Sequence, residues 1–161
     1  MTPTDVVDAL RRAGATVATA ESLTGGLVVA GLVDVAGASE VVRGGLVAYA
    51  PDVKTGVLGV PADIVAEHGT VAEATARSMA ERVRVLCEAT YGVATTGVAG
   101  PEPSEGKPAG TVHIAVAGPT GTSHRLLSLV GDRQRIRTAT VVEALDLLVA
   151  RLREESDVDL R

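Results

Sequence analysis

The fold of this 161-residue chain is decided by residues 16–27, which read TVATAESLTGGL. The apolar run over residues 16–20 is typical of a short buried strand, and Gly25-Gly26 leads into a second apolar run over residues 27–35. This second run is too long for most strands, so it predicts a helix that ends at Gly37. A buried strand, a glycine turn and a helix in succession favour an α/β domain.

The rest of the chain continues this alternation. We expect helices over residues 4–13, 27–35, 52–58, 61–68, 72–89 and 133–154, and strands over residues 16–20, 41–50, 91–95, 110–117 and 122–129. Thr70 and Glu73 have the spacing of a capping box for the long helix over residues 72–89. The last two strands are separated only by Gly118-Pro119-Thr120-Gly121, which predicts a hairpin.

This order of elements predicts a three-layer α/β/α sandwich with a mixed, mostly parallel sheet. No internal repeat or linker interrupts the sequence. We therefore expect a single domain over residues 1–155, followed by a frayed tail over residues 156–161.

The composition restricts the classes of function. Hydrophobic residues make up 46% of the chain, yet Phe and Trp are absent, so the core must consist of Val, Leu, Ile and Ala. The single cysteine, Cys87, excludes an intrachain disulfide framework and suits the cytoplasm, and no signal peptide or membrane span is expected. A net charge of −5 with two aromatic residues argues against a nucleic-acid partner.

Three segments follow predicted strands, which is where open α/β sheets bind their ligands, and the first and third of them are rich in glycine. In the first, residues 20–26, Ser22 lies at a strand-to-helix turn. A nucleophilic serine would be exposed there, beside helix-start N–H groups that stabilise an oxyanion. The alternative is that Ser22 or Thr24 only caps the helix. The Gly-x-Ser-x-Gly elbow of α/β-hydrolases is absent.

The second segment, residues 47–54, ends a strand at Tyr49 and places Lys54 on the short helix that follows. A lysine can activate a serine when burial keeps its amine neutral, whereas a surface lysine is the alternative interpretation. His68, His113 and His124 are expected to be structural, because no carboxylate spacing near them indicates a triad or a metal site.

The third segment, residues 95–101, continues to the motif at residues 107–111. It fails the test for a phosphate-binding P-loop, although the backbone amides of residues 97–100 can hold an anion; a surface loop without a ligand is the alternative. Gly131-Asp132-Arg133, with Arg137 one turn later, places positive charge at a helix start. That charge suits a phosphate or carboxylate, or belongs to a solvated helix face.

Five motifs occur together in a fixed order. They are Glu21-Ser22-x-Thr24-Gly25-Gly26, Tyr49 with Lys54, Thr96-Gly97-Val98-Ala99-Gly100-Pro101, Lys107-Pro108-x-Gly110-Thr111 and Gly131-Asp132-Arg133. Over residues 4–153 the chain thereby resembles the C-terminal domain of the competence/damage-inducible CinA family, the nicotinamide-nucleotide amidohydrolases.

The resemblance implies deamidation of nicotinamide mononucleotide to nicotinic acid mononucleotide and ammonia, in pyridine-nucleotide recycling, by a serine–lysine hydrolase without metal or cofactor. Ser22 would be the nucleophile and Lys54 its general base, and Tyr49 and Thr96 would assist at the reacting centre. Arg133 or Arg137 would hold the phosphate. The other substrate-binding residues implied are Glu21, Thr24, Gly25, Gly26, Gly97, Ala99 and Gly100.

The chain departs from the family pattern at Leu23, where a cysteine is common, and at Ala50-Pro51, where small polar residues are common. The domain that precedes this one in larger family proteins has no counterpart here, so we expect a stand-alone version without pyrophosphatase activity. A non-catalytic nucleotide-binding or regulatory module is the alternative function, and a structural oligomerisation domain is a third. The Val- and Leu-rich helices are compatible with a homodimer, although their apolar faces can equally be internal.

Overall fold

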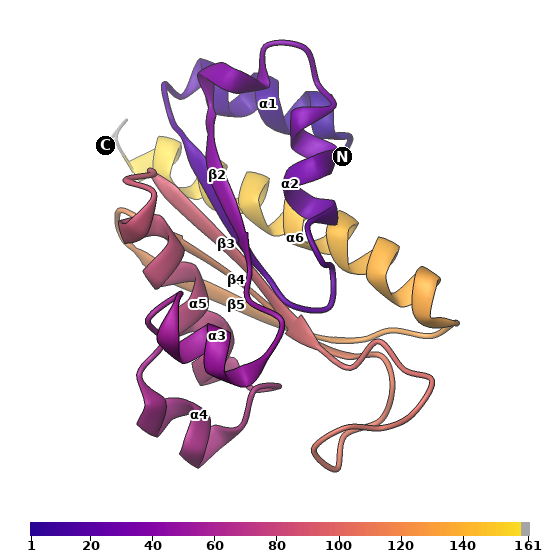
Figure 1. The fold of residues 1–161 in the computed structure, drawn as a ribbon. Helices are drawn as coiled ribbons and strands as arrows, with labels where there is room; N and C mark the ends of the chain where they lie inside the picture. Colours follow the sequence, from indigo (N-terminus) through magenta and orange to yellow (C-terminus); the bar gives the residue numbers. More distant parts are fainter. Residues whose placement is uncertain (159–161) are drawn as a thin grey trace.

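The computed structural model describes residues 1–158 and contains one five-stranded sheet with helices on both faces (Figure 1). The strands are β1 (Val17–Glu21), β2 (Val42–Val47), β3 (Tyr91–Gly97), β4 (Thr111–Gly118) and β5 (Gly121–Ser128). The helices are α1 (Pro3–Arg12), α2 (Leu27–Val33), the 3₁₀ turn η1 (Ala38–Glu40), α3 (Pro51–Gly56), α4 (Ala62–His68), α5 (Glu73–Leu86) and α6 (Arg133–Val158).

The strand order is β2-β1-β3-β4-β5, and the sheet is mixed. Strand β1 pairs in parallel with both β2 and β3, whereas the β3–β4 and β4–β5 pairs are antiparallel. The prediction of a mixed sheet covered by helices is confirmed, but the prediction of a mostly parallel sheet is wrong. The reason is that β4 and β5 return directly through a loop and a hairpin, without the crossover helix that a parallel connection requires.

The two faces of the sheet have different cores. Val112, Ile114 and Val116 alternate along β4 toward a large Val/Leu/Ile cluster shared with α1, α2 and α6. Ala115 and Ala117 face the opposite way, into a cluster of smaller side chains that packs against α5. Small side chains on this second face let α5 approach the sheet closely.

Element ends differ from the prediction at several places. β2 ends at Val47 rather than at residue 50, and α5 ends at Leu86 rather than at residue 89. The helix α6 runs through Ser156, where a tail was expected, and residues 159–161 lie outside the described part of the chain.

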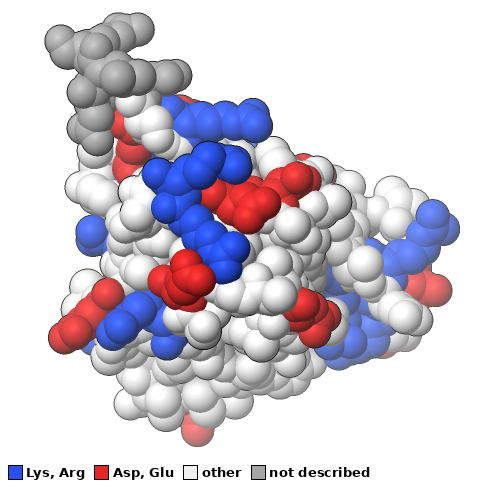
Figure 2. Space-filling view, turned by 90° about the horizontal axis from the view of Figure 1, so that it is seen from above, with Lys and Arg blue, Asp and Glu red and all other residues white. Residues whose placement is uncertain are grey.

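Charged side chains of both signs lie close together on the face shown in Figure 2. Among the ion pairs in the molecule, Arg11 contacts Asp8 and Glu40 at N–O distances of 3.8 and 3.2 Å. Within residues 1–158, no helix is both long and apolar enough to cross a membrane.

Candidate active site

The three parallel strands end at the same edge of the sheet, and a pocket of about 420 Å³ opens there. Segments after β1, β2 and β3, the α4–α5 connection and the start of α6 form its walls. The lining residues are Ser22, Leu23, Tyr49, Pro51, Lys54, Thr70, Val71, Thr96, Gly97, Val98, Ala99, Gly100, Pro101, Glu102, Ser104 and Arg133.

Ser22 and Lys54 are in direct contact within this pocket. The Lys54 Nζ lies 2.9 Å from the Ser22 Oγ, and both side chains are buried, with Lys54 only 1% exposed. The same Nζ donates hydrogen bonds to the carbonyl oxygens of Ala48, at 2.7 Å, and Tyr49, at 3.0 Å. The interpretation of Lys54 as a surface lysine is therefore wrong.

Burial changes the protonation of Lys54. Desolvation of the ammonium lowers the Lys54 pKa from 10.5 to about 8, and the negative charge of Glu105 opposes part of this decrease. Lys54 consequently loses its proton nearer neutral pH than an exposed lysine does, and the neutral amine is the state that a general base requires.

A turn of unusual backbone conformation holds Ser22 at the end of β1. The Ser22 N–H donates to the Thr95 carbonyl at 3.0 Å, and the Ser22 carbonyl accepts from the Gly25 N–H at 3.0 Å. Gly25 and Gly26 have φ angles of +59° and +99°, which side chains with a Cβ rarely adopt. Both glycines therefore shape the turn, and neither lines the pocket.

The structure does not support Ser22 or Thr24 as a helix cap. The N-cap of α2 is Gly26, and the Thr24 hydroxyl lies 2.8 Å from that of Thr95, away from the helix start. Ser22 is instead in contact with Lys54, as described above.

Glu21 performs the capping instead. Its buried carboxylate accepts hydrogen bonds from the N–H groups of Gly26 at 3.2 Å, Val28 at 2.9 Å and Val29 at 3.0 Å. These donors would otherwise be unsatisfied at a helix start. Two expectations change as a result: Glu21 does not line the pocket, and these helix-start N–H groups are not free to stabilise an oxyanion.

The two candidate arginines occupy different places. Arg133 lines the pocket, where its guanidinium donates to the Gly100 carbonyl at 2.7 Å and to the Tyr49 hydroxyl at 3.1 Å. Arg137 donates to the carbonyls of Leu23 at 2.8 Å and Thr24 at 3.2 Å, outside the pocket lining. Arg133 is consequently the arginine positioned to meet a ligand.

Thr96, Gly97, Ala99 and Gly100 lie on the pocket wall. The Thr96 hydroxyl donates to the Thr70 carbonyl at 2.7 Å, which ties the end of β3 to the α4–α5 connection.

Sequence reasoning missed this α4–α5 connection as part of the site. Thr70 and Val71 line the pocket, and the predicted capping box is wrong because Ala72 is the N-cap of α5. The spacing of Thr70 and Glu73 favours a capping box, and no motif in the sequence indicates that Thr70 lines the pocket.

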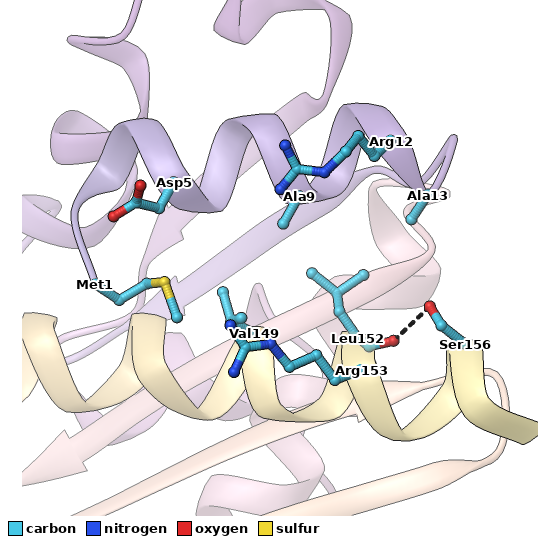
Figure 3. Close-up of a pocket in the computed structure, with 9 residues that line it drawn as sticks. All are labelled: Met1, Asp5, Ala9, Arg12, Ala13, Val149, Leu152, Arg153 and Ser156. Atoms are coloured by element: carbon cyan, nitrogen blue, oxygen red, sulfur yellow. Dashed lines mark hydrogen bonds between the residues drawn. The ribbon is translucent and has the colours of Figure 1, made fainter.

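A larger hollow of about 760 Å³ lies between α1 and α6 (Figure 3). Arg12 and Arg153 line it, together with Ser156, whose hydroxyl donates to the Leu152 carbonyl at 2.9 Å. No lysine lies among its lining residues, so it does not reproduce the serine–lysine contact of the smaller pocket.

The histidines lie outside the pocket lining. His113 and His124 face each other with ring nitrogens 2.9 Å apart on β4 and β5, and His68 ends α4. Within residues 1–158, no cluster of three His, Cys, Asp or Glu side chains has a geometry suited to a metal ion.

Comparison with known proteins identifies the family. A sequence profile of the CinA C-terminal domain matches residues 2–152. The chain belongs to the CinA C-terminal domain family. Two curated CinA-like relatives agree: one from Frankia casuarinae is 54% identical over 143 residues, and one from Anaeromyxobacter dehalogenans is 49% identical over 152 residues.

These matches cover 89% and 94% of the chain but only 33% and 37% of the relatives. The chain therefore spans about a third of the length of these curated CinA-like proteins.

Solved structures of the CinA family match at full length. The competence/damage inducible protein CihA from Agrobacterium tumefaciens is 38% identical, with a TM-score of 0.84 over 93% of this chain and 97% of that one. The competence damage-inducible protein A from Klebsiella pneumoniae is 32% identical, with a TM-score of 0.88 over 94% and 98% of the two chains.

Proposed function

We propose that this CinA-family chain is a nicotinamide-nucleotide amidohydrolase that converts nicotinamide mononucleotide to nicotinic acid mononucleotide and ammonia. The observation that carries the proposal is the buried contact between the Lys54 Nζ and the Ser22 Oγ, at 2.9 Å. Binding a nucleotide needs no such pair, whereas acyl transfer needs a nucleophile beside a base.

The surroundings of Lys54 suit the base form of the amine. A neutral lysine has two N–H donors and one lone pair. The carbonyls of Ala48 and Tyr49 accept the two N–H groups, so the lone pair is directed at Ser22. In this state the Ser22 hydroxyl donates its hydrogen bond to Lys54, which prepares the proton transfer.

The reaction proceeds in two halves. The Ser22 Oγ attacks the carboxamide carbon while its proton moves to Lys54, and the resulting tetrahedral intermediate carries an oxyanion. Lys54 then returns the proton to the amide nitrogen, the carbon–nitrogen bond breaks, and ammonia leaves behind an acyl ester on Ser22. In the second half, Lys54 takes a proton from water as the hydroxide attacks the ester. Lys54 then returns this proton to the Ser22 oxygen as the ester bond breaks, and the carboxylic acid product gives its own proton to solvent.

One backbone donor beside the nucleophile is available for the oxyanion. The Leu23 N–H, directly after Ser22, donates no hydrogen bond to any described residue, and Leu23 lines the pocket. The residue after the nucleophile supplies an oxyanion donor in other serine hydrolases. Arg133, with the phosphate of the nucleotide as its partner, would hold the far end of the substrate.

Ammonia release from nicotinamide mononucleotide by the purified chain tests the proposal, with EDTA present because the family resemblance implies no metal. We expect turnover by the native chain and none by Ser22→Ala. Activity that persists in Ser22→Ala would refute the assignment of Ser22 as the nucleophile. No turnover, with the nucleotide still raising the melting temperature of the native chain, would favour the alternative of a nucleotide-binding module.

A further inference from the structure

The β3–β4 loop contains a tight turn in which Glu105 has a backbone conformation that glutamate rarely adopts. The backbones of Ser104 and Lys107 pair in both directions, at 3.0 and 2.9 Å, around the central residues Glu105 and Gly106. These two have φ angles of +52° and +71°. Such turns favour Asn, Asp or Gly at both central positions, so a glutamate at residue 105 has an energetic cost. An uncommon conformation of this kind points to a role for the side chain.

The Glu105 carboxylate binds the α4–α5 connection. One oxygen accepts hydrogen bonds from the Thr70 N–H at 2.9 Å and the Thr70 hydroxyl at 2.6 Å, and the other accepts from the Val71 N–H at 3.0 Å. Lys107 contacts the same carboxylate at 3.9 Å and donates to the Val71 carbonyl. Two side chains of one turn thus bind the α4–α5 connection, Glu105 at Thr70 and Val71 and Lys107 at Val71.

The residues held in this way form part of the active-site wall. Thr70 and Val71 both line the Ser22–Lys54 pocket, and the Thr70 carbonyl accepts the Thr96 hydroxyl at 2.7 Å. A continuous series of hydrogen bonds therefore runs from Glu105 through Thr70 to Thr96. It joins the β3–β4 loop and the end of β3 to the α4–α5 connection.

We propose that Glu105 is a positioning residue of the Ser22–Lys54 site, which latches the β3–β4 loop onto Thr70 and Val71 and thereby fixes Thr96 and the pocket wall. Its catalytic consequence rests on the proposed amidohydrolase function. The latch itself does not, because it can be observed without any substrate.

Glu105 also acts on Lys54 through its charge. Its carboxylate raises the Lys54 pKa against the larger effect of burial. Other charged or titratable side chains on the surrounding elements include Glu21, Tyr49, Asp52, Asp63, Glu67, His68, Glu73, Arg77, Glu81, Arg82, Arg84, Glu102, Lys107 and Arg133. Glu105 is the charge among them that shifts the Lys54 pKa.

The chain allows a clean measurement of this effect, because it contains only two lysines, Lys54 and Lys107. Protein labelled with ¹³C at the lysine ε-carbon gives two signals, and Lys107→Arg assigns them. We expect the Lys54 signal to titrate at lower pH in Glu105→Gln than in the native chain. An unchanged titration would overturn the role of Glu105 in setting the state of Lys54, whether or not the chain has enzymatic activity.

Glu88 supplies a matched control. Among residues 1–158 it is the other non-glycine residue with a positive φ, +49°, and it lies before β3, at the sheet end opposite the pocket. Glu88→Gln removes the same charge, and we expect it to leave the Lys54 titration unchanged. If Glu88→Gln shifts the Lys54 titration as much as Glu105→Gln does, the overall net charge causes the shift, and the proposal is overturned.

Kinetics test the positioning role. Glu105→Asn suits the backbone of the turn, so it should fold, yet its shorter side chain does not reach Val71. We expect kcat to fall by about tenfold with KM changed by less than about twofold, as for a misplaced reacting group. In Glu105→Gln the rise of activity with pH should move to lower pH. Native kcat and an unmoved pH profile in these variants would overturn the inference, whereas inactivity of the native chain would count against the proposed function alone.

Discussion

Lys54 and Ser22 lie at hydrogen-bond distance in the candidate active site. Lys54 is 1% exposed, and its short helix α3 begins at Pro51, two residues after Tyr49, whose carbonyl accepts a hydrogen bond from the Lys54 Nζ. The proline sets the first turn of the helix, which directs residue 54 back toward the end of β1. The departure of Ala50-Pro51 from the family pattern thus coincides with the start of the helix that carries the candidate base.

The pH dependence of activity follows from the pKa of Lys54, which is lowered to about 8 by burial. The base form is the neutral amine, so its fraction grows as pH rises. We expect kcat/KM to increase with pH to a plateau, with a midpoint near the pKa of about 8. Steady-state rates between pH 6 and pH 10 measure this profile.

Lys54→Arg is the matched variant for this profile. It keeps the positive charge but cannot lose its proton in this range, so we expect no activity at any pH. A native profile without an ascending limb, or an active Lys54→Arg, would contradict the assignment of the base.

Arg133 and Arg137 are predicted to differ in what their removal changes. Arg133→Ala should raise KM for nicotinamide mononucleotide by about tenfold to a hundredfold, because a charged hydrogen bond to phosphate is lost. Arg137→Ala should lower the free energy of unfolding by about 1–3 kcal/mol, since the carbonyls of Leu23 and Thr24 lose their donor. Initial rates and urea unfolding of both variants distinguish the effects; the reverse pattern would assign the phosphate to Arg137.

At the scale of the elements, close approach between helix and sheet depends on glycines and alanines. A Cβ added at Gly92 on β3 would lie 2.1 Å from the Ala80 carbonyl oxygen on α5. The obstacle is backbone rather than a flexible side chain, so α5 or β3 would have to move. The small-residue face of the sheet is therefore the reason that α5 packs flat across β3 and β4.

Two glycine substitutions test this packing. Gly92→Ala should lower the free energy of unfolding by about 3 kcal/mol, the upper part of the range for overpacking a core. Gly56→Ala is the control: it lies in α3 with nothing within 4 Å of the added Cβ, and it should raise stability by about 0.5–1 kcal/mol. Denaturant unfolding measures both, and equal stability of Gly92→Ala and the native chain would contradict the close contact.

Across the whole molecule, the strand order explains why residues distant in sequence meet. The segments that follow β1, β2 and β3 all leave the sheet at one edge, where parallel α/β sheets bind ligands. The start of α6 returns to that edge and adds Arg133. At the other side of the sheet, β4 and β5 join α5 through His113, His124 and Glu73, with the His124 ring nitrogen 3.6 Å from the Glu73 carboxylate.

The His113–His124 pair is predicted to make the whole fold sensitive to acid. Burial lowers the pKa of both rings below 6.5; the His113 pKa is lowered further by the charges of His124 and Lys107, and Glu73 opposes both shifts. The unfolded chain therefore takes up protons first as pH falls below 6.5, and the folded state loses up to about 1.4 kcal/mol per pH unit for each ring.

Urea unfolding between pH 7 and pH 4 measures this loss. His124→Gln should unfold with a smaller dependence on pH over that range, because one of the coupled rings no longer titrates. Identical slopes for His124→Gln and the native chain would contradict the prediction.

The sequence by itself determined the local features of this protein. Apolar runs, glycines and prolines predicted the strands, helices and turns to within a few residues, and the glycine-rich turn after β1 indicated Ser22 as a candidate nucleophile. These predictions succeed because hydrophobic periodicity and backbone preferences act over neighbouring residues. The family resemblance added Lys54 as the general base. Spacing alone did not decide whether this lysine is buried or lies on the surface.

Only the tertiary structure decided which side chains meet. It assigned Glu21 to the start of α2, placed Arg133 rather than Arg137 at the pocket, and joined Glu105 to Thr70. Arg133 and Tyr49 are separated by 84 positions and Glu105 and Thr70 by 35, so neither contact leaves a local pattern in the sequence. Only the tertiary structure showed that the β3–β4 pair is antiparallel. The direction of pairing depends on how the chain returns to the sheet and not on the residues of one strand.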